Sequence, residues 1–417
     1  MMIWHVRGGR PLRGTIPVQG SKNAVLPILA ASILAPCETT LTGVPELKDV
    51  GITLRILRHL GCAAELKDHV IYIDSRPLSR CDIPHSLMRE LRSSVIFLGA
   101  ILCRCGEARL SLPGGCELGP RPVDLHLDAL RALGADVTEG GGDIIARGGH
   151  LEGTKILLPF PSVGATENAM LAACAAAGET TILGAAREPE IVDLQRYLRR
   201  LGADLSGAGT AEITVRGFRP KAHAEHRILP DRIAAATILC AAAASGGEIS
   251  LTNANPSHFL TVLDSLSEAG CDIITKSDTV SLHAPRRLTA PRPIVTRPYP
   301  GFPTDAQPPL MAACLKAKGT TVFTENIFQN RYRHAAELRR LGAEVSIEGR
   351  VAYITGVERL TAAPLTAGDL RGGAAMIVAA LSAEGETEIF DEDHISRGYD
   401  RLDQQLNALG AEVRCTY

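Results

Sequence analysis

Residues 167–205 read ENAMLAACAAAGETTILGAAREPEIVDLQRYLRRLGADL, and this stretch contains one complete structural unit. An Ala-rich apolar segment leads through a glycine into the β-branched run TTIL. The apolar residues that follow have helical spacing: Leu194, Tyr197, Leu198 and Leu201. Gly202 is typical of the residue that ends a helix. The stretch therefore predicts a buried helix, a strand, an amphipathic helix and a second strand.

This unit is repeated along the whole chain. The glycine that ends the amphipathic helix recurs about every 70 residues, at Gly61, Gly134, Gly202, Gly270, Gly342 and Gly410. A strand signature precedes each glycine: CETTLTG, GEARLSL, GETTILG, GGEISLT, KGTTVFT and GETEIFD. The period is longer than that of solenoid repeats. The sequence therefore predicts six α/β units.

The Ala-rich segments decide how the units pack. The segment 234–244 is apolar on every side, and such a helix belongs inside a protein. We therefore expect helices inside and strands outside, unlike a TIM barrel. Six units divide into two domains of three, with the boundary near Pro230. A solenoid is the alternative, but an evenly continued array does not predict the differences between the loops of the units.

Composition limits the class of protein. A chain of 417 residues exceeds what one core usually organises, so two domains are expected. The net charge of −2 and the isoelectric point near 6.6 argue against a protein that binds nucleic acid or a membrane surface. Eleven cysteines without a CxxC pair indicate reduced thiols, and no histidine spacing predicts a metal site. We expect a soluble, cytoplasmic protein.

Charged residues, prolines and glycines gather in certain loops. In PGGCELGPRPVDLH, residues 113–126, the cation of Arg121 favours the thiolate of Cys116. Other such loops are GSKN (20–23), SVGATEN (162–168), YPGFPTDAQ (299–307), ENIFQNR (325–331), DLR (369–371) and HISRGY (394–399). Taken alone, a cysteine is more often buried, a lysine more often solvated, and an aspartate in such a loop more often a turn former.

Taken in order, these phrases resemble the enolpyruvyl transferases, in particular the UDP-N-acetylglucosamine 1-carboxyvinyltransferase family. The matching text is SKNAVLPILAAS, PGGCELGPRPVDLH, SVGATENAMLAA, AREPEIVDL, YPGFPTDAQPP, ENIFQNRYRH and ISRGYDR. The resemblance implies two inside-out α/β barrels, each of three βαβαββ repeats with strands outside and helices inside. Residues 21–229 would form the first barrel, and residues 1–20 with 230–417 the second.

The resemblance also implies an activity. The substrates would be phosphoenolpyruvate and UDP-N-acetylglucosamine, and phosphate would be released in the first committed step of peptidoglycan precursor synthesis. No cofactor or metal is implied, no protein partner is predicted, and the epoxide antibiotic fosfomycin would modify Cys116. A role in cell-wall biogenesis, cell shape and cell division follows.

The implied roles fall on particular residues. Phosphoenolpyruvate would be held by the cations of Lys22, Arg121 and Arg397, with Arg92 and Arg371 as helpers. Cys116 would deliver a proton to the methylene carbon, and Asp305 would accept the proton of the sugar 3-hydroxyl. Asn23 would orient the sugar, while Asp369 and Arg331 would support the tetrahedral intermediate. The nucleotide sugar would contact Arg121, Pro122, Val123, Asp124, Leu125, Ser162, Val163, Gly164 and Ile327.

Two departures keep alternatives open. The family phrase PDRIEAGT is PDRIAAAT here, so Ala234 and Ala236 replace Glu and Gly. This change leaves open, as an alternative to the enzyme, a catalytically silent paralogue that binds the nucleotide sugar and regulates a pathway. Ala306 stands where the family has Met after the aspartate. The shikimate-pathway enolpyruvyl transferase is a third reading, but it lacks the thiol loop around Cys116.

Overall fold

The computed structural model describes residues 1–111 and 123–416, which form two compact units. The C-terminal unit comprises residues 1–19 and 230–416. The N-terminal unit comprises residues 20–111 and 123–229. Each unit has its own hydrophobic core.

Each unit contains three four-stranded sheets. In the N-terminal unit the orders are β14(His223–Arg227)-β3(Glu38–Thr42)-β5(Val70–Asp74)-β4(Ala63–Lys67), β6(Asp82–Ile83)-β7(Glu107–Ser111)-β9(Asp143–Arg147)-β8(Asp136–Gly140) and β10(Lys155–Leu157)-β11(Thr180–Leu183)-β13(Glu212–Phe218)-β12(Ala203–Ser206). In the C-terminal unit they are β22(Leu365–Ala367)-β23(Glu386–Asp391)-β1(Met2–Arg7)-β24(Glu412–Thr416), β2(Arg13–Pro17)-β15(Glu248–Thr252)-β17(Thr279–His283)-β16(Asp272–Thr275) and β18(Ile294–Val295)-β19(Thr320–Thr324)-β21(Val351–Thr355)-β20(Glu344–Glu348).

All six sheets have one pairing pattern. In the order given, the first two strands are parallel, and the third and fourth join by antiparallel pairing. The second strand of each sheet carries the repeated signature. Its alternate side chains are buried, as Ile249 and Leu251 are in β15. Each sheet therefore turns one face to the core and one to solvent. The predicted sixfold repeat is confirmed.

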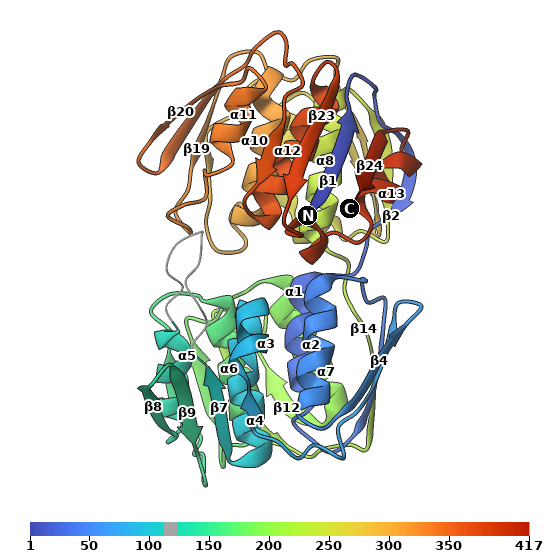
Figure 1. Ribbon diagram of the computed structural model, residues 1–417. Coiled ribbons are helices and arrows are strands. Elements are labelled where there is room, and N and C mark those ends of the chain that lie inside the picture. Colours follow the sequence, from blue (N-terminus) through green and yellow to red (C-terminus); the bar gives the residue numbers. More distant parts are fainter. Residues whose placement is uncertain (112–122, 417) are drawn as a thin grey trace. The chain divides into compact units, whose positions relative to one another are not determined.

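The inner helices are the Ala-rich segments. They are α1(Lys22–Ala31), α4(Phe97–Cys105) and α6(Val163–Ala173) in one unit, and α8(Arg232–Ser245), α10(Gln307–Ala313) and α12(Leu370–Ser382) in the other. In the C-terminal unit α8, α10 and α12 pack against one another, and the sheets enclose them (Figure 1). Ala234 and Ala236 are buried in α8, where Asp231 caps the first turn. The predicted arrangement of helices inside and strands outside is confirmed.

A second set of helices is amphipathic. It comprises α2(Lys48–His59), α5(Asp124–Ala132), α7(Pro189–Leu201), α9(Leu260–Glu268), α11(Ala335–Arg340) and α13(Leu402–Ala408). The predicted apolar face of α7, including Leu194 and Leu201, is buried, while Arg199 and Arg200 are exposed. All six repeated glycines have φ between 89° and 116°, a left-handed region that favours glycine. The predicted helix ends are therefore confirmed.

The remaining elements are short. They are α3(His85–Glu90) and the 3₁₀ turns η1(Arg92–Ile96), η2(Pro256–His258), η3(Thr304–Ala306), η4(Cys314–Lys316) and η5(Ile395–Arg397). Within residues 1–111 and 123–416, none of the helices combines the length and apolar character that crossing a bilayer requires.

The inner helices of the N-terminal unit approach closely at Gly99 of α4. A Cβ atom at Gly99 would lie 2.7 Å from the backbone oxygen of Asn168 in α6. We expect Gly99→Ala to lower the free energy of unfolding by about 1–3 kcal/mol, because the helices must separate. Gly51→Ala is the matched control, since Gly51 lies exposed in α2 with open space around it. It should stabilise the protein by about 1 kcal/mol. Chemical denaturation measures both changes, and equal effects would contradict this packing.

Candidate active site

In five repeats, a candidate residue lies where the inner helix begins. Lys22 is the first residue of α1, Arg92 begins the turn before α4, Ser162 caps α6, Asp305 lies in the turn before α10, and Asp369 caps α12. Backbone N–H groups without intrahelical partners lie at such helix starts, and they favour anionic ligands. The repeat therefore places candidate residues at equivalent positions.

In the N-terminal unit, Lys22 is fixed by a buried carboxylate. Its Nζ lies 2.6 Å from Oδ2 of Asp49, which is in the first turn of α2 and whose side chain is 2% exposed. The Lys22 side chain is 13% exposed, so its ammonium group is nearly buried beside this carboxylate. Asn23 follows in α1 and is half-buried. The pair holds one cation at the start of the first inner helix.

His126 is a functional candidate that sequence reasoning did not select, although it ends the phrase RPVDLH. The amide of Asn168 determines its tautomer. Gly99 N–H donates to Asn168 Oδ1 at 2.8 Å, so the Asn168 amide nitrogen must face the other way. That nitrogen donates to Val95 O at 2.9 Å and to His126 Nδ1 at 2.7 Å. Because Nδ1 accepts a hydrogen bond, the proton of the neutral ring is on Nε2.

The His126 ring lies against the start of α6. A Cβ atom at Gly164 would be 2.8 Å from His126 Cε1 and 3.2 Å from Nε2, so glycine is required for this contact. Burial lowers the pKa of His126 to about 4. The ring is therefore a neutral donor held next to the segment 162–164, where the nucleotide sugar is expected.

The other candidates of this unit take part in the fold as well. Ser162 Oγ accepts from Ala165 N at 3.3 Å and caps α6. Val123, Leu125 and Val163 pack against the core, while Asp124 is exposed. Cys116, Arg121 and Pro122 lie outside the described residues, and of Arg92 only the backbone is described.

In the C-terminal unit, Asp305 lies between two guanidinium groups. Arg331 Nη2 donates to Asp305 Oδ1 at 2.7 Å, and Arg371 Nε donates to Oδ2 at 3.3 Å. The side chains of Arg331 and Arg371 are 1% and 4% exposed, whereas that of Asp305 is 29% exposed. The carboxylate is therefore accessible and its orientation is fixed by buried cations.

Arg371 and Asp369 are held by their own contacts. Asp369 Oδ1 accepts from the backbone N–H groups of Arg371 and Gly372, both at 3.0 Å, and so caps α12. The Arg371 guanidinium carbon lies 5.3 Å from the centre of the Tyr399 ring. The Tyr399 hydroxyl is 2.9 Å from that of Thr237 in α8. These contacts hold Arg371 at the start of α12 and connect it through Tyr399 with α8.

Three further residues of the C-terminal unit bear on the candidate site. Burial lowers the pKa of His334 to about 4, an effect that Asp369 partly opposes. Arg397 is half-buried in η5, and its backbone N–H donates to His394 O at 3.2 Å. Ile327 is half-buried and its N–H donates to Glu325 Oε1 at 2.7 Å. Within the described residues, no three His, Cys, Asp or Glu side chains are grouped as metal ligands would be.

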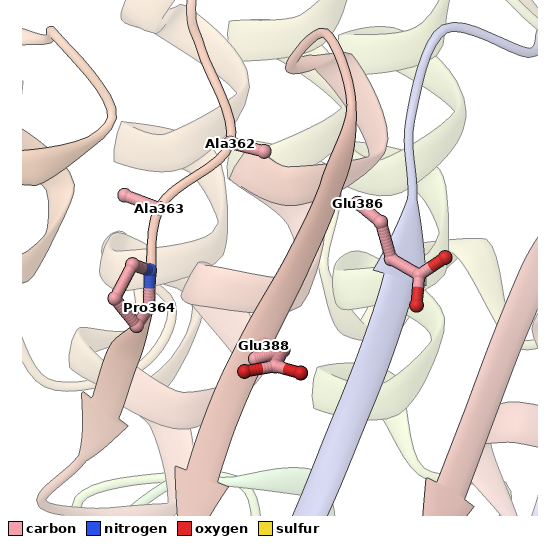
Figure 2. Close-up of a pocket in the computed structure, with 5 residues that line it drawn as sticks. All are labelled: Ala362, Ala363, Pro364, Glu386 and Glu388. Carbon is pink, nitrogen blue, oxygen red and sulfur yellow. The ribbon is translucent and has the colours of Figure 1, made fainter.

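A hollow in the C-terminal unit lies elsewhere. It has a volume of about 290 Å³, and Ala362, Ala363, Pro364, Glu386 and Glu388 line it (Figure 2). The two glutamates lie on β23. His5 of the neighbouring strand β1 has its Nδ1 3.5 Å from Glu386 Oε1. None of the candidate residues lines this hollow, so we do not include it in the active site.

The chain is similar to known proteins over nearly its whole length. Residues 6–406 match the family described as EPSP synthase (3-phosphoshikimate 1-carboxyvinyltransferase). A relative from Caldanaerobacter subterraneus subsp. tengcongensis, named UDP-N-acetylglucosamine 1-carboxyvinyltransferase 2, is 44% identical over 98% of both chains. One from Symbiobacterium thermophilum, named UDP-N-acetylglucosamine 1-carboxyvinyltransferase 1, is 46% identical over 98% of this chain and 94% of its own.

Solved structures show the same fold. The enolpyruvyl transferase NikO from Streptomyces tendae is similar with a TM-score of 0.88 at 25% identity, covering 100% of this chain and 99% of its own. EPSP synthase from Acinetobacter baumannii has a TM-score of 0.77 at 20% identity, with both chains fully covered. The predicted fold class is confirmed.

The neutral state of His126 makes stability depend on pH. Its pKa of about 4 in the folded chain lies below the usual value of about 6.5, so the unfolded chain binds the proton first. The contribution is complete above pH 6.5 and is lost as the pH falls towards 4. Between pH 7 and 5 the loss is about 2 kcal/mol.

We expect His126→Asn to shrink the difference in unfolding free energy between pH 7 and pH 5 by this amount. Denaturant titrations at both pH values measure it. The same replacement at His150 is the control, because that side chain is exposed. An unchanged difference in His126→Asn would show that folding does not lower the pKa of His126.

Proposed function

Because the chain belongs to the UDP-N-acetylglucosamine 1-carboxyvinyltransferase family, we propose that it carries out the reaction for which that family is named. The chain is an enzyme, a transferase that moves the enolpyruvyl group of phosphoenolpyruvate to the 3-hydroxyl of UDP-N-acetylglucosamine with release of phosphate. The observation that carries this conclusion is 42–46% identity to enzymes of that name over 98% of this chain. The reaction is the first committed step of peptidoglycan precursor synthesis.

The residues divide the chemistry between them. Lys22, Arg121 and Arg397 hold the anionic phosphoenolpyruvate, with Arg92 and Arg371 as further cations. The pairing of Lys22 with Asp49 and of Arg371 with Asp305 supports this role, because both cations are held in fixed positions.

The addition step needs an acid and a base. The Cys116 thiol gives a proton to the methylene carbon, which becomes a methyl group. The sugar oxygen bonds to the neighbouring carbon as its hydroxyl proton passes to Asp305. Phosphate then leaves as the Cys116 thiolate takes a proton back from the methyl group, which restores the double bond. The accessible carboxylate of Asp305 supports its role as base, and Arg331 steadies it during the reaction.

The nucleotide sugar needs neutral and backbone donors as well. Asn23 orients the sugar, and Asp369 supports the tetrahedral intermediate. The remaining contacts come from Arg121 to Leu125, from Ser162, Val163 and Gly164, and from Ile327. The neutral Nε2–H donor of His126 beside Gly164 supports a polar ligand at the start of α6.

The two units carry different parts of this chemistry. We assign residues 21–229, with Lys22 and Cys116, to one domain, and residues 1–20 with 230–417, with Asp305 and Arg397, to the other. The division of the described residues after Gln19 and at Pro230 supports these boundaries. Substrates of this kind place the enzyme in the cytoplasm, where it serves growth and division of the cell wall.

The reaction itself is tested by phosphate release. We expect the protein to release phosphate from phosphoenolpyruvate with UDP-N-acetylglucosamine as acceptor, and to show no release with shikimate 3-phosphate. Mass spectrometry of the product should show the enolpyruvyl adduct of the nucleotide sugar. Binding of the nucleotide sugar without turnover would instead identify a catalytically silent paralogue.

The thiol loop gives a second test. We expect fosfomycin to add one molecule per chain at Cys116, because a thiolate next to a cation opens the epoxide. Peptide mapping locates the adduct. Cys116→Asp should lose alkylation and keep activity, because a carboxylic acid can also protonate carbon. Cys105→Ser is the control for modification of another accessible cysteine. Cys105 is an exposed residue, but partial burial of its sulfur raises the pKa of the thiol. An adduct at Cys105 in the wild-type protein would refute the assignment.

A further inference from the structure

Glu325 is a buried carboxylate at the end of β19 to which the reaction described above assigns no role. It is 1% exposed. Its Oε1 accepts from the backbone N–H groups of Ile327 at 2.7 Å and Phe328 at 2.9 Å. Its Oε2 accepts from the Thr304 hydroxyl at 3.0 Å. One side chain therefore joins the loop 325–328 to the turn that contains Asp305.

Burying a carboxylate is costly unless its oxygens are fully hydrogen-bonded. In the described part of the chain Glu325 has no ion pair, so three neutral donors offset this cost. Two of these donors are successive backbone N–H groups that turn towards one oxygen. The charge therefore stabilises one conformation of the loop and one position of Thr304.

Thr304 passes this restraint on to Asp305. Its hydroxyl donates to Glu325, while its carbonyl oxygen accepts from Arg331 Nε at 3.1 Å and Nη2 at 2.9 Å. The same Arg331 Nη2 donates to Asp305 Oδ1 at 2.7 Å. A continuous hydrogen-bonded path thus runs from the Ile327 peptide through Glu325, Thr304 and Arg331 to the carboxylate of Asp305.

We propose that Glu325 is a positioning residue for the transfer reaction, which fixes the Asp305 carboxylate relative to the Ile327 peptide. This rests on the proposed function, in which Ile327 contacts the nucleotide sugar and Asp305 takes the proton of its 3-hydroxyl. A base must lie within hydrogen-bonding distance of the proton that it removes. Glu325 sets that distance by joining the sugar-binding loop to the turn that carries the base.

The test uses variants that separate the hydrogen bond from the bulk of the side chain. Thr304→Val removes the hydroxyl and keeps the carbonyl that binds Arg331, whereas Thr304→Ser keeps both. Glu325→Gln keeps an oxygen for the two N–H groups and presents its amide nitrogen to the Thr304 hydroxyl, which can accept. Thr387→Val is the control for the same replacement elsewhere, because Thr387 lies in β23 of the same unit and its hydroxyl has no hydrogen-bond partner among the described residues.

We expect Thr304→Val to lower kcat by about 100-fold, the loss that a displacement of about 1 Å at a reacting group can cause. The KM for phosphoenolpyruvate should change much less than kcat, because Lys22, Arg121 and Arg397 lie in other segments and of its proposed ligands Arg371 contacts Asp305. Thr304→Ser and Glu325→Gln should stay within about threefold of the wild-type kcat. Thr387→Val should keep the wild-type kcat, which excludes a general effect of replacing a threonine of this unit by valine. If Thr304→Val does not fold, Thr304→Ala removes the same hydroxyl with less bulk.

The outcomes separate this proposal from the proposed function. A wild-type protein that releases no phosphate with UDP-N-acetylglucosamine refutes the function and, with it, the positioning role. An active wild type with unchanged kcat in folded Thr304→Val refutes the positioning role alone. Equal losses of kcat in Thr304→Val and Thr304→Ser would also refute it, as would a crystal structure of Thr304→Val in which Asp305 and the Ile327 peptide keep their wild-type positions.

Discussion

Each unit depends on covering three helices that are apolar on nearly every side. Such helices cannot face water without exposing a large apolar surface, so the sheets must surround them. The repeated strand meets this need because its alternate side chains, such as Ile249 and Leu251, point to one face. Small residues let the helices approach closely, as Gly99 of α4 does with α6. One packing requirement thus accounts for helices inside and strands outside.

The same requirement decides where charge can be placed. Along an inner helix a charged side chain would be desolvated, whereas at its start the chain emerges from the core and backbone N–H groups offer partners. Lys22, Asp305 and Asp369 all lie at such starts. Even there each charge has a partner. Lys22 pairs with Asp49, Asp305 pairs with Arg331 and Arg371, and Asp369 accepts from backbone N–H groups in the first turn of α12. The chemistry is concentrated at the few places where this fold tolerates ions.

The sequence predicted what is local and repeated. The glycines after each amphipathic helix, the buried face of α7 and the Ala-rich inner helices follow from spacing and residue type alone. Asp305 was selected through a resemblance, but its contacts with Arg331 and Arg371 join residues that are 26 and 66 positions apart. No local pattern encodes such distances. For the same reason Glu325 and the pairing of Asn168 with His126 were missed, because a buried polar side chain is recognised by its partners.

The first strand of the chain has a consequence for synthesis. Strand β1 lies between β23 and β24, and Trp4 Nε1 donates to Asp391 at 3.3 Å although the two residues are 387 positions apart. The ribosome makes residues 20–229 before any of the partners of β1 exist. The N-terminal unit can therefore fold during translation, while the leading strand waits unpaired until the last residues emerge. During that interval the apolar side chains of Trp4 and Val6, which are buried in the finished protein, are exposed to water.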